Sequence, residues 1–221
     1  MRPAEGASME GKMAVISGFS GAGKGTIVRR LLETYPEDYV LSVSKTTRKP
    51  RKGEEEGVHY FFVTRERFEE EIGAGKFIEH AEFNGNYYGT PLDWVTAQQE
   101  AGKNVILEIE VQGALQVKER FPDAVLIFVT PPSMRELVRR LLGRGSETPE
   151  DIRNRLEIAA VRECRLMTDY DYIVVNDDLD LCVEDVRSMI AGTYEKTDVT
   201  GLIARISDEI QNILESGELK L

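Results

Sequence analysis

A glycine-rich loop near the start of the chain constrains the fold more than any other stretch. Residues 13–16 are apolar and predict a short buried strand, and residues from Thr26 onward predict a helix. Between them stand a lysine, Lys24, and four glycines, Gly18, Gly21, Gly23 and Gly25. Glycines let successive backbone N–H groups point at one anion, and the positive end of the helix dipole faces the same place. The pattern G-x-x-x-x-G-K between a strand and a helix therefore indicates a phosphate-binding loop rather than a turn with a chance lysine.

The composition excludes several classes of function. A net charge of −11 argues against general nucleic-acid binding, which needs a basic face. No apolar run approaches the roughly 18 residues that span a membrane, so we expect no membrane partner, and no signal-peptide pattern follows the N-terminus. Cys164 and Cys182 make no metal or redox spacing, so we expect reduced thiols in a cytoplasmic protein. At 221 residues, the chain is long enough for one sizeable domain with small inserted lobes.

Two clusters of positive charge stand out against this acidic background. The first comprises Lys45, Arg48, Lys49, Arg51 and Lys52, and the second comprises Arg135, Arg139, Arg140 and Arg144. Taken alone, either cluster is compatible with a solvated face. Because the chain also has a phosphate-binding loop, we interpret both clusters as local anion sites.

Short apolar strands alternate with helices along most of the chain. We expect buried strands at residues 13–17, 39–43, 104–109, 124–129 and 172–175. We expect one helix to end near residue 35 and others to span residues 91–102, 113–120, 134–143, 150–167 and 180–194. This alternation predicts an α/β fold, in which a parallel sheet forms the core and carries helices on both faces.

The stretch formed by residues 44–90 interrupts the alternation. It contains expected strands at residues 60–63 and 77–83 and a helix that begins after Thr64. An Asn-Gly pair at residues 84–86 is typical of a hairpin turn. We therefore predict a small, mostly β lobe inserted in the core.

The two ends of the chain lie outside this pattern. Residues 1–11 are small, polar and aperiodic, and they predict a disordered lead-in. The tail at residues 196–221 spaces its apolar residues as one face of a helix does. That amphipathic C-terminal helix either packs on its own core or forms a dimer contact, so the sequence allows a monomer or a homodimer.

Several motifs occur in a fixed order along the chain. They lie at residues 17–26, 42–54, 57–60, 77–79, 85–90, 107–113, 140–145 and 175–178. From about residue 12 to residue 195 the chain resembles the guanylate kinases, a family of the nucleoside monophosphate kinase group with a phosphate-binding loop. The resemblance implies one domain over residues 12–195. Its parts would be a core (residues 12–43 and 91–195), a GMP-binding lobe (residues 44–90) and a helical lid (about residues 133–155).

The resemblance implies that the inserted lobe holds GMP. The residues assigned to this task are Ser44, Arg48, Arg51, Tyr60, Glu79, Tyr88, Thr90 and Glu110. Arg48 and Arg51 would grip the phosphate with their planar guanidinium groups. Tyr60 and Tyr88 would add hydroxyl bonds, and the alternative for either ring is cross-strand packing. Glu79 and Glu110 would accept hydrogen bonds from the N1–H and N2–H groups of guanine, with Ser44 and Thr90 as neutral helpers, whereas adenine would leave a carboxylate unpaired.

The resemblance also implies an ATP site around the phosphate-binding loop. The residues assigned to it are Gly18, Phe19, Ser20, Gly21, Ala22, Gly23, Lys24, Gly25, Thr26 and Asn176. Asn176 would contact the adenosine end, or alternatively cap the last strand. Lid arginines Arg140, Arg144 and Arg155 would reach the γ-phosphate and, with Lys24 and Arg48, carry catalysis. Mg²⁺ would bridge the β- and γ-phosphates largely through water; Gly25 has no ligand to offer, which leaves Thr26 or Glu108 as weak candidates.

The implied reaction transfers the γ-phosphoryl group of ATP to GMP, and to dGMP, in purine nucleotide metabolism. Positioning and charge neutralisation would supply most of the rate, and the mobile lobes would close to exclude water. One rival is a binding module of a scaffolding protein that keeps the fold without catalysis. Another keeps the chemistry with a different acceptor, such as another monophosphate or a sugar phosphate.

Overall fold

The computed structural model describes residues 10–143 and 148–216. The chain divides into two compact units. The first unit comprises Met1–Val15 and Leu32–Ala124, and the second comprises Ile16–Leu31 and Val125–Leu221. The predicted GMP-binding lobe at residues 44–90 lies within the first unit, and the predicted lid lies within the second.

The first unit combines part of a parallel sheet with a small second sheet. Its elements are β2 (Tyr39–Leu41), β3 (Lys45–Thr46), β4 (Phe61–Phe62), α2 (Arg65–Gly73), β5 (Phe77–Phe83), β6 (Asn86–Pro91), α3 (Leu92–Glu100), β7 (Asn104–Glu108) and α4 (Val111–Arg120). Strands β2 and β7 pair in parallel, with Tyr39 opposite Asn104. The ladder ends at Leu41, two residues earlier than predicted, although the Ser42 amide still donates to the Ile106 carbonyl at 2.8 Å.

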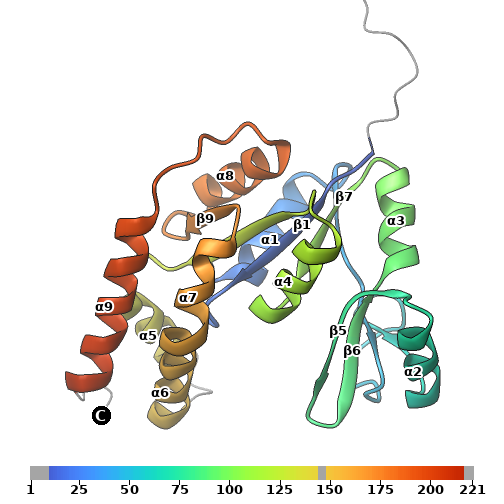
Figure 1. The fold of residues 1–221 in the computed structure, drawn as a ribbon, viewed down its shortest axis with the longest axis horizontal. Coiled ribbons are helices and arrows are strands. Elements are labelled where there is room, and N and C mark those ends of the chain that lie inside the picture. The colour runs from blue at the N-terminus through green and yellow to red at the C-terminus, as the bar shows by residue number, and fades with distance from the viewer. Residues whose placement is uncertain (1–9, 144–147, 217–221) are drawn as a thin grey trace, which may run out of the picture. The chain divides into compact units, whose positions relative to one another are not determined.

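The small sheet has the strand order β4-β3-β6-β5. Strand β3 pairs in parallel with β4 and antiparallel with β6, and β5 and β6 form an antiparallel hairpin. The hairpin turn at Asn84 (φ 49°) and Gly85 (φ 73°) has the two positive φ angles that an Asn-Gly turn supplies, so this prediction is confirmed. Helix α2 lies alongside the hairpin (Figure 1), and the Thr64 side chain caps it by accepting from the Arg67 amide.

Strand β5 contains an irregularity that the sequence did not predict. Phe77 is opposite Pro91 and His80 is opposite Gly89, so Ile78 and Glu79 together face a single residue, Thr90. Two residues opposite one define a β-bulge. In a regular strand, neighbours point to opposite faces, but here Ile78 (1% exposed) and Glu79 (9% exposed) are both buried.

The second unit contains the remainder of the parallel sheet and most of the helices. Its elements are α1 (Lys24–Thr34, which runs past the unit boundary), β8 (Val125–Thr130), α5 (Met134–Gly143), α6 (Pro149–Ile158), the π-helix η1 (Ala159–Glu163), α7 (Cys164–Leu166), the 3₁₀-helix η2 (Met167–Asp169), β9 (Tyr172–Val175), α8 (Leu179–Ala191) and α9 (Thr200–Ser216). Strands β8 and β9 pair in parallel, with Ile127 opposite Tyr172. Strand β1 (Met13–Gly18) is divided between the units after Val15, and the sheet order is β2-β7-β1-β8-β9. The predicted α/β fold with a parallel sheet is confirmed.

The long helix predicted at residues 150–167 is present as a continuous helical segment, but it contains a π-helical stretch that the sequence did not predict. Helix α6 ends at Ile158, η1 follows as a π-helix, and a short α-turn and a 3₁₀-turn complete the segment up to Asp169. A π-turn closes its hydrogen bonds over one more residue than an α-turn. The residues of η1 read Ala-Ala-Val-Arg-Glu, all compatible with an α-helix, so no residue type signals the change.

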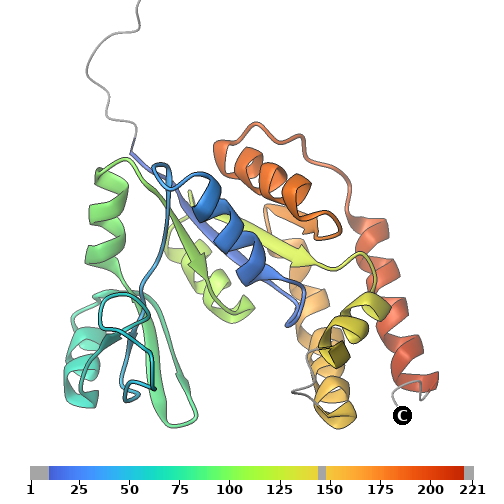
Figure 2. The ribbon, with the colours of Figure 1, turned by 180° about the vertical axis from the view of Figure 1, so that it is seen from behind.

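The C-terminal helix α9 packs on its own chain, which is the first of the two alternatives for the tail. Its residues Ile206, Ile210 and Ile213 are buried, and α9 lies beside α5, α6 and α7 (Figures 1 and 2). A carboxylate oxygen of Glu209 accepts from the Met134 amide, at the start of α5, at 2.7 Å. No helix among residues 10–143 and 148–216 is long and apolar enough to cross a membrane.

Candidate functional site

The phosphate-binding loop occupies the turn between β1 and α1 in the second unit. Gly23 has φ 99°, and a Cβ at this position would lie 2.3 Å from the Nδ2 atom of Asn176. That amide nitrogen donates to the Ala22 carbonyl at 2.7 Å. Only glycine therefore allows both the backbone conformation and the close approach of Asn176. Asn176 supports the loop from the end of β9, a contact that neither of its two sequence interpretations included.

Two further residues of the loop, Phe19 and Lys24, make side-chain contacts that hold the loop in place. The Lys24 ammonium donates to the carbonyls of Gly18 (2.7 Å) and Phe19 (3.1 Å). The Phe19 ring is fully buried and packs edge-on against Phe128 with 5.0 Å between ring centroids. Phe19 therefore contributes its backbone to the loop while its side chain ties the loop to the core.

The structure brings two of the predicted lid arginines to this loop. Arg140 donates from Nη2 to the Asn176 carbonyl (3.0 Å) and from Nη1 to the Ala22 carbonyl (3.4 Å). Arg155 donates to the Ser20 hydroxyl. Glu136 pairs with Arg140 at 2.8 Å, and hydrogen bonds from Arg139 and then Arg140 lower the pKa of this carboxyl to about 2. Arg144 lies outside the described residues.

The first unit holds the residues predicted to bind the GMP phosphate. Arg48 donates from Nη2 to Glu54 Oε1 at 2.7 Å, and the backbone amide of Arg51 donates to the other oxygen of the same carboxylate at 2.7 Å. These bonds, the one from Arg48 foremost, lower the pKa of Glu54 to about 2. The pairing with Glu54, followed by a bond to Tyr88, raises the pKa of Arg48 above its usual range. Glu54 thus links the two arginines, a role that the sequence did not reveal.

Tyr60 and Tyr88 lie next to Arg48. Their ring centroids are 6.0 Å apart in an edge-on arrangement, and the Arg48 guanidinium lies 5.4 Å from the Tyr60 ring centroid. Cross-strand packing and a position beside the arginine therefore occur together. Both tyrosines therefore lie beside an arginine that is predicted to bind the GMP phosphate.

The four residues predicted to bind guanine lie in or next to four elements of the first unit, β3, β5, β6 and α4. Glu79 in the β5 bulge accepts from the Thr90 hydroxyl in β6 at 2.8 Å, and both residues are buried. Burial raises the pKa of Glu79, against the effect of its bonds to Thr90. Glu110 is exposed at the N-terminal cap of α4, and the Ser44 carbonyl accepts from the Phe61 amide at 2.9 Å beside β3. The structure thus joins Glu79 and Thr90, as predicted for a shared task.

A second ion pair in the first unit also escaped the sequence analysis. The Lys45 ammonium lies 2.7 Å from Glu71 of α2, and the side chains are only 16% and 6% exposed. Arg67 donates to the other oxygen of Glu71 at 2.9 Å. Lys45 was predicted to belong to an anion-binding cluster, but the carboxylate that it contacts is the protein's own. Because the pairing joins residues 26 positions apart, local sequence gave no signal for it.

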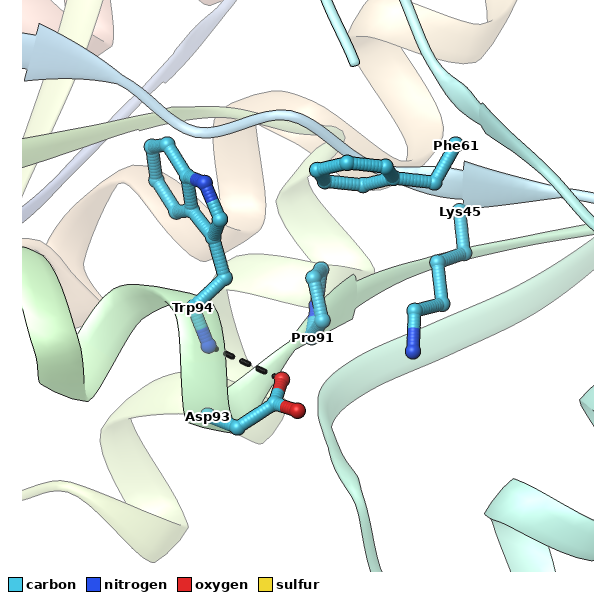
Figure 3. A pocket seen from close by; sticks show the side chains of 5 residues that line it. All are labelled: Lys45, Phe61, Pro91, Asp93 and Trp94. Atoms are coloured by element: carbon cyan, nitrogen blue, oxygen red, sulfur yellow. Dashed lines mark hydrogen bonds between the residues drawn. The ribbon is translucent and has the colours of Figure 1, made fainter. Parts of the chain in front are cut away.

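The first unit also contains a cavity of about 340 Å³. It is lined by Lys45, Phe61, Pro91, Asp93 and Trp94 (Figure 3). Three of these follow directly after Ser44, Tyr60 and Thr90 in the sequence. Among the described residues, none of those assigned to GMP is one of the five that line this cavity. Trp94 and Phe61 both contribute aromatic rings to its lining.

The metal requirement can be tested against the side chains present. Within residues 10–143 and 148–216, no group of three or more His, Cys, Asp or Glu side chains is placed to hold a metal ion. Thr26 and Glu108 are both exposed single candidates, and they lie in different units. This fits an ion carried mainly by nucleotide phosphates and water rather than by a protein cage.

Comparisons with known proteins give a consistent result. The guanylate kinase family model matches residues 10–193. A guanylate kinase of Bacillus cereus is 50% identical over 187 residues, covering 85% of this chain and 91% of the relative. A guanylate kinase of Streptococcus agalactiae is 46% identical over 214 residues, covering 97% and 99%. The crystal structure of a guanylate kinase from Anaplasma phagocytophilum matches with a TM-score of 0.59 and 34% identity, covering 86% of this chain and 89% of that one. The chain therefore belongs to the guanylate kinase family.

Proposed function

We propose that the residues assigned above to two nucleotide sites carry out the reaction of this guanylate kinase. The enzyme phosphorylates GMP to GDP at the expense of ATP. The observation that carries the assignment on the acceptor side is that the first unit holds both the buried Glu79–Thr90 pair, on strands β5 and β6, and the Arg48–Glu54 pair, in the loop after β3. One pair offers acceptors for a base, and the other offers a cation for a phosphate.

On the acceptor side, Arg48 and Arg51 bind the GMP phosphate with bonds added by the hydroxyls of Tyr60 and Tyr88. Glu79 and Glu110 accept from the N1–H and N2–H donors of guanine, with Ser44 and Thr90 assisting. Adenine has a lone pair where guanine has N1–H, so it would leave a buried carboxylate unpaired. Such mismatches cost up to roughly 10⁴-fold in selectivity at hydrogen-bonding sites.

On the donor side, the amides of residues 18–26 surround the ATP phosphates, and Lys24 exchanges its loop carbonyls for phosphate oxygens. Arg140, Arg144 and Arg155 neutralise the charge on the γ-phosphoryl group. An oxygen of the GMP phosphate forms the new bond to the γ-phosphorus, while the bond to the bridging oxygen of ADP breaks. The attacking group is already an anion, so positioning and charge neutralisation provide catalysis without a strong base. Transfer requires the two nucleotides to meet with water excluded, which motion of the lobes would achieve.

A divalent ion completes the donor. Mg²⁺ would be held by the β- and γ-phosphates with water and with at most one side chain, Thr26 or Glu108. When bound, it neutralises phosphate charge during transfer. Asn176 holds the loop through Ala22 and borders the adenosine end. The same site would accept dGMP, since no residue assigned here reads the 2′-hydroxyl. We place the activity in the cytoplasm, where both nucleotides occur.

A non-catalytic binding module would have no need of an ATP site. The similarity to guanylate kinases argues against such a module, and Lys24 and Arg155, which we assign to the donor site, are both present at the loop. A different acceptor remains distinguishable by experiment. We expect strong ADP formation from ATP and Mg²⁺ with GMP, and none with AMP, UMP or CMP. Lys24→Ala should abolish turnover while GMP binding persists in calorimetry; turnover with another monophosphate would contradict the roles of Glu79 and Glu110.

A further inference from the structure

The β5 bulge determines where the Glu79 carboxylate lies. Within the bulge both Ile78 and Glu79 are buried, and Oε1 of Glu79 accepts from the Thr90 hydroxyl at 2.8 Å. Oε2 lies 3.3 Å from the place that a Cβ on Gly113 would occupy, in the first turn of α4. A small shift of the bulged backbone would therefore move the carboxylate relative to both neighbours.

Arg120, the last residue of α4, holds that backbone. Its Nη1 atom donates to the carbonyl of Phe77 and to the carbonyl of Ile78, the latter at 3.0 Å. These are the two carbonyls that directly precede Glu79 in the chain. A bulge interrupts the regular ladder of backbone hydrogen bonds between two strands. At this bulge the charged guanidinium of Arg120 donates to the backbone carbonyls, and such charge-assisted hydrogen bonds are stronger than those from a neutral donor.

Helix α4 connects the two carboxylates assigned to guanine. Glu110 is its N-terminal cap, and Gly113 in its first turn faces Glu79. At the other end of the helix, Arg120 donates to the carbonyls of the two residues that precede Glu79. A site held by a regular helix is fixed more accurately than one held by loops. The helix thus carries Glu110 at one end and positions Glu79 from the other.

We propose that Arg120 is a positioning residue for guanine recognition, which acts by fixing the bulged segment of β5 so that Glu79 stays directed at the base. The proposal rests on the role given above to Glu79. Arg120 itself is exposed and does not contact GMP in this assignment. Its removal should weaken GMP binding, because errors of about 1 Å in a positioned group cost up to roughly 10²-fold.

The first test compares matched variants of α4 by steady-state kinetics. Arg120→Met should raise the KM for GMP about tenfold, with kcat and the KM for ATP within about twofold. Lys118→Met is the control, because Lys118 donates from the same helix to the Ala124 carbonyl at 2.8 Å, away from β5. Arg120→Lys should recover part of the loss, since an ammonium can still donate to these carbonyls. An unchanged KM in Arg120→Met, or an equal rise in Lys118→Met, would overturn the proposal.

A double-mutant cycle separates an effect through Glu79 from general damage. In a Glu79→Gln background, Arg120→Met should raise the KM for GMP by less than about threefold, because the group that it positions is already altered. A full additional tenfold loss would show that Arg120 acts independently of Glu79, and the proposal would fail. If Glu79→Gln alone leaves the KM unchanged, both the role of Glu79 and the positioning role fail; if only Arg120→Met is silent, the role of Glu79 stands.

Discussion

Arg48 and Glu54 form a close ion pair, in which Nη2 and Oε1 are 2.7 Å apart and the side chains are 14% and 17% exposed. The second carboxylate oxygen accepts from the backbone amide of Arg51. One acidic side chain therefore organises both arginines assigned to the GMP phosphate. In the loop around Pro50, the Glu54 carboxylate therefore holds the side chain of Arg48 and the backbone of Arg51 in place.

Replacing Glu54 should impair acceptor binding more than catalysis. Glu54→Gln should raise the KM for GMP about five- to tenfold with kcat nearly unchanged, because an interaction common to the ground and transition states is lost. Glu55→Gln removes an equal charge from the exposed neighbouring residue and should have little effect. The pKa of Glu54 is lowered to about 2, so the pairing is complete above the ordinary carboxyl pKa and is lost only as the pH falls toward 2. A Glu54-dependent titration between pH 5 and 8 would contradict this account.

GMP binding should depend on pH through the protonation of Glu79. Burial raises the pKa of Glu79, so protonation begins above the ordinary carboxyl range and removes an acceptor that GMP needs. The KM for GMP should therefore rise as the pH falls through the raised pKa, and Glu79→Gln should abolish that dependence. The free energy of unfolding should depend on pH with the opposite sign. In this pH window the folded state keeps a proton on Glu79 that the unfolded state has lost, so the free energy of unfolding falls as the pH rises. A wild-type KM that is flat down to pH 4.5 would exclude this behaviour.

The phosphate-binding loop should not tolerate a methyl group at Gly23. Gly23→Ala places a Cβ 2.3 Å from the Asn176 amide and at a φ of 99°, so the loop must distort. We expect the KM for ATP to rise more than about tenfold while GMP affinity is retained. Gly201→Ala in α9 meets open space and is the control; it should be neutral or raise stability by up to about 1 kcal/mol. An unchanged KM for ATP in Gly23→Ala would show that the loop accommodates the methyl group without losing ATP binding.

The contact between α9 and the start of α5 should matter for stability. Glu209 accepts from the Met134 amide at 2.7 Å, where an acidic group also favours the helix dipole. Glu209→Gln should lower the free energy of unfolding by about 1 kcal/mol in a chemical denaturation experiment. Asp208→Asn removes the same charge from the exposed adjacent position. Equal losses in the two variants would assign the effect to net charge instead.

The sequence predicted features that depend on residue type and local spacing. The buried strands, the Asn-Gly turn at Asn84 and Gly85, and the loop around Lys24 each follow from the conformational needs of a few neighbouring residues. The Asn-Gly turn and the expected strands of residues 44–90 also predicted the small sheet that contains Glu79, whereas its assignment as a GMP-binding lobe stays a prediction.

The features that escaped prediction depend on pairings between distant residues or on backbone irregularities. Glu71 contacts Lys45 across 26 positions, and Arg120 reaches Ile78 across 42. The bulge at Glu79 arises from how β5 is aligned with β6, which a single strand sequence does not specify. Glu54 stood inside a recognised motif, but nothing in its residue type indicated that its carboxylate would hold Arg48.

The π-helix η1 also bears on how this segment could change in length. A π-turn accommodates one residue more than an α-turn, and each residue of an α-helix turns the chain by about 100°. One residue inserted within Ala159–Glu163 would thereby be absorbed inside a helix instead of in a loop. Deleting one residue there would restore an ordinary α-helix but rotate everything after Glu163, including the buried Cys164, away from its present neighbours. Lineages with and without this extra residue would therefore need different packing along the whole following segment.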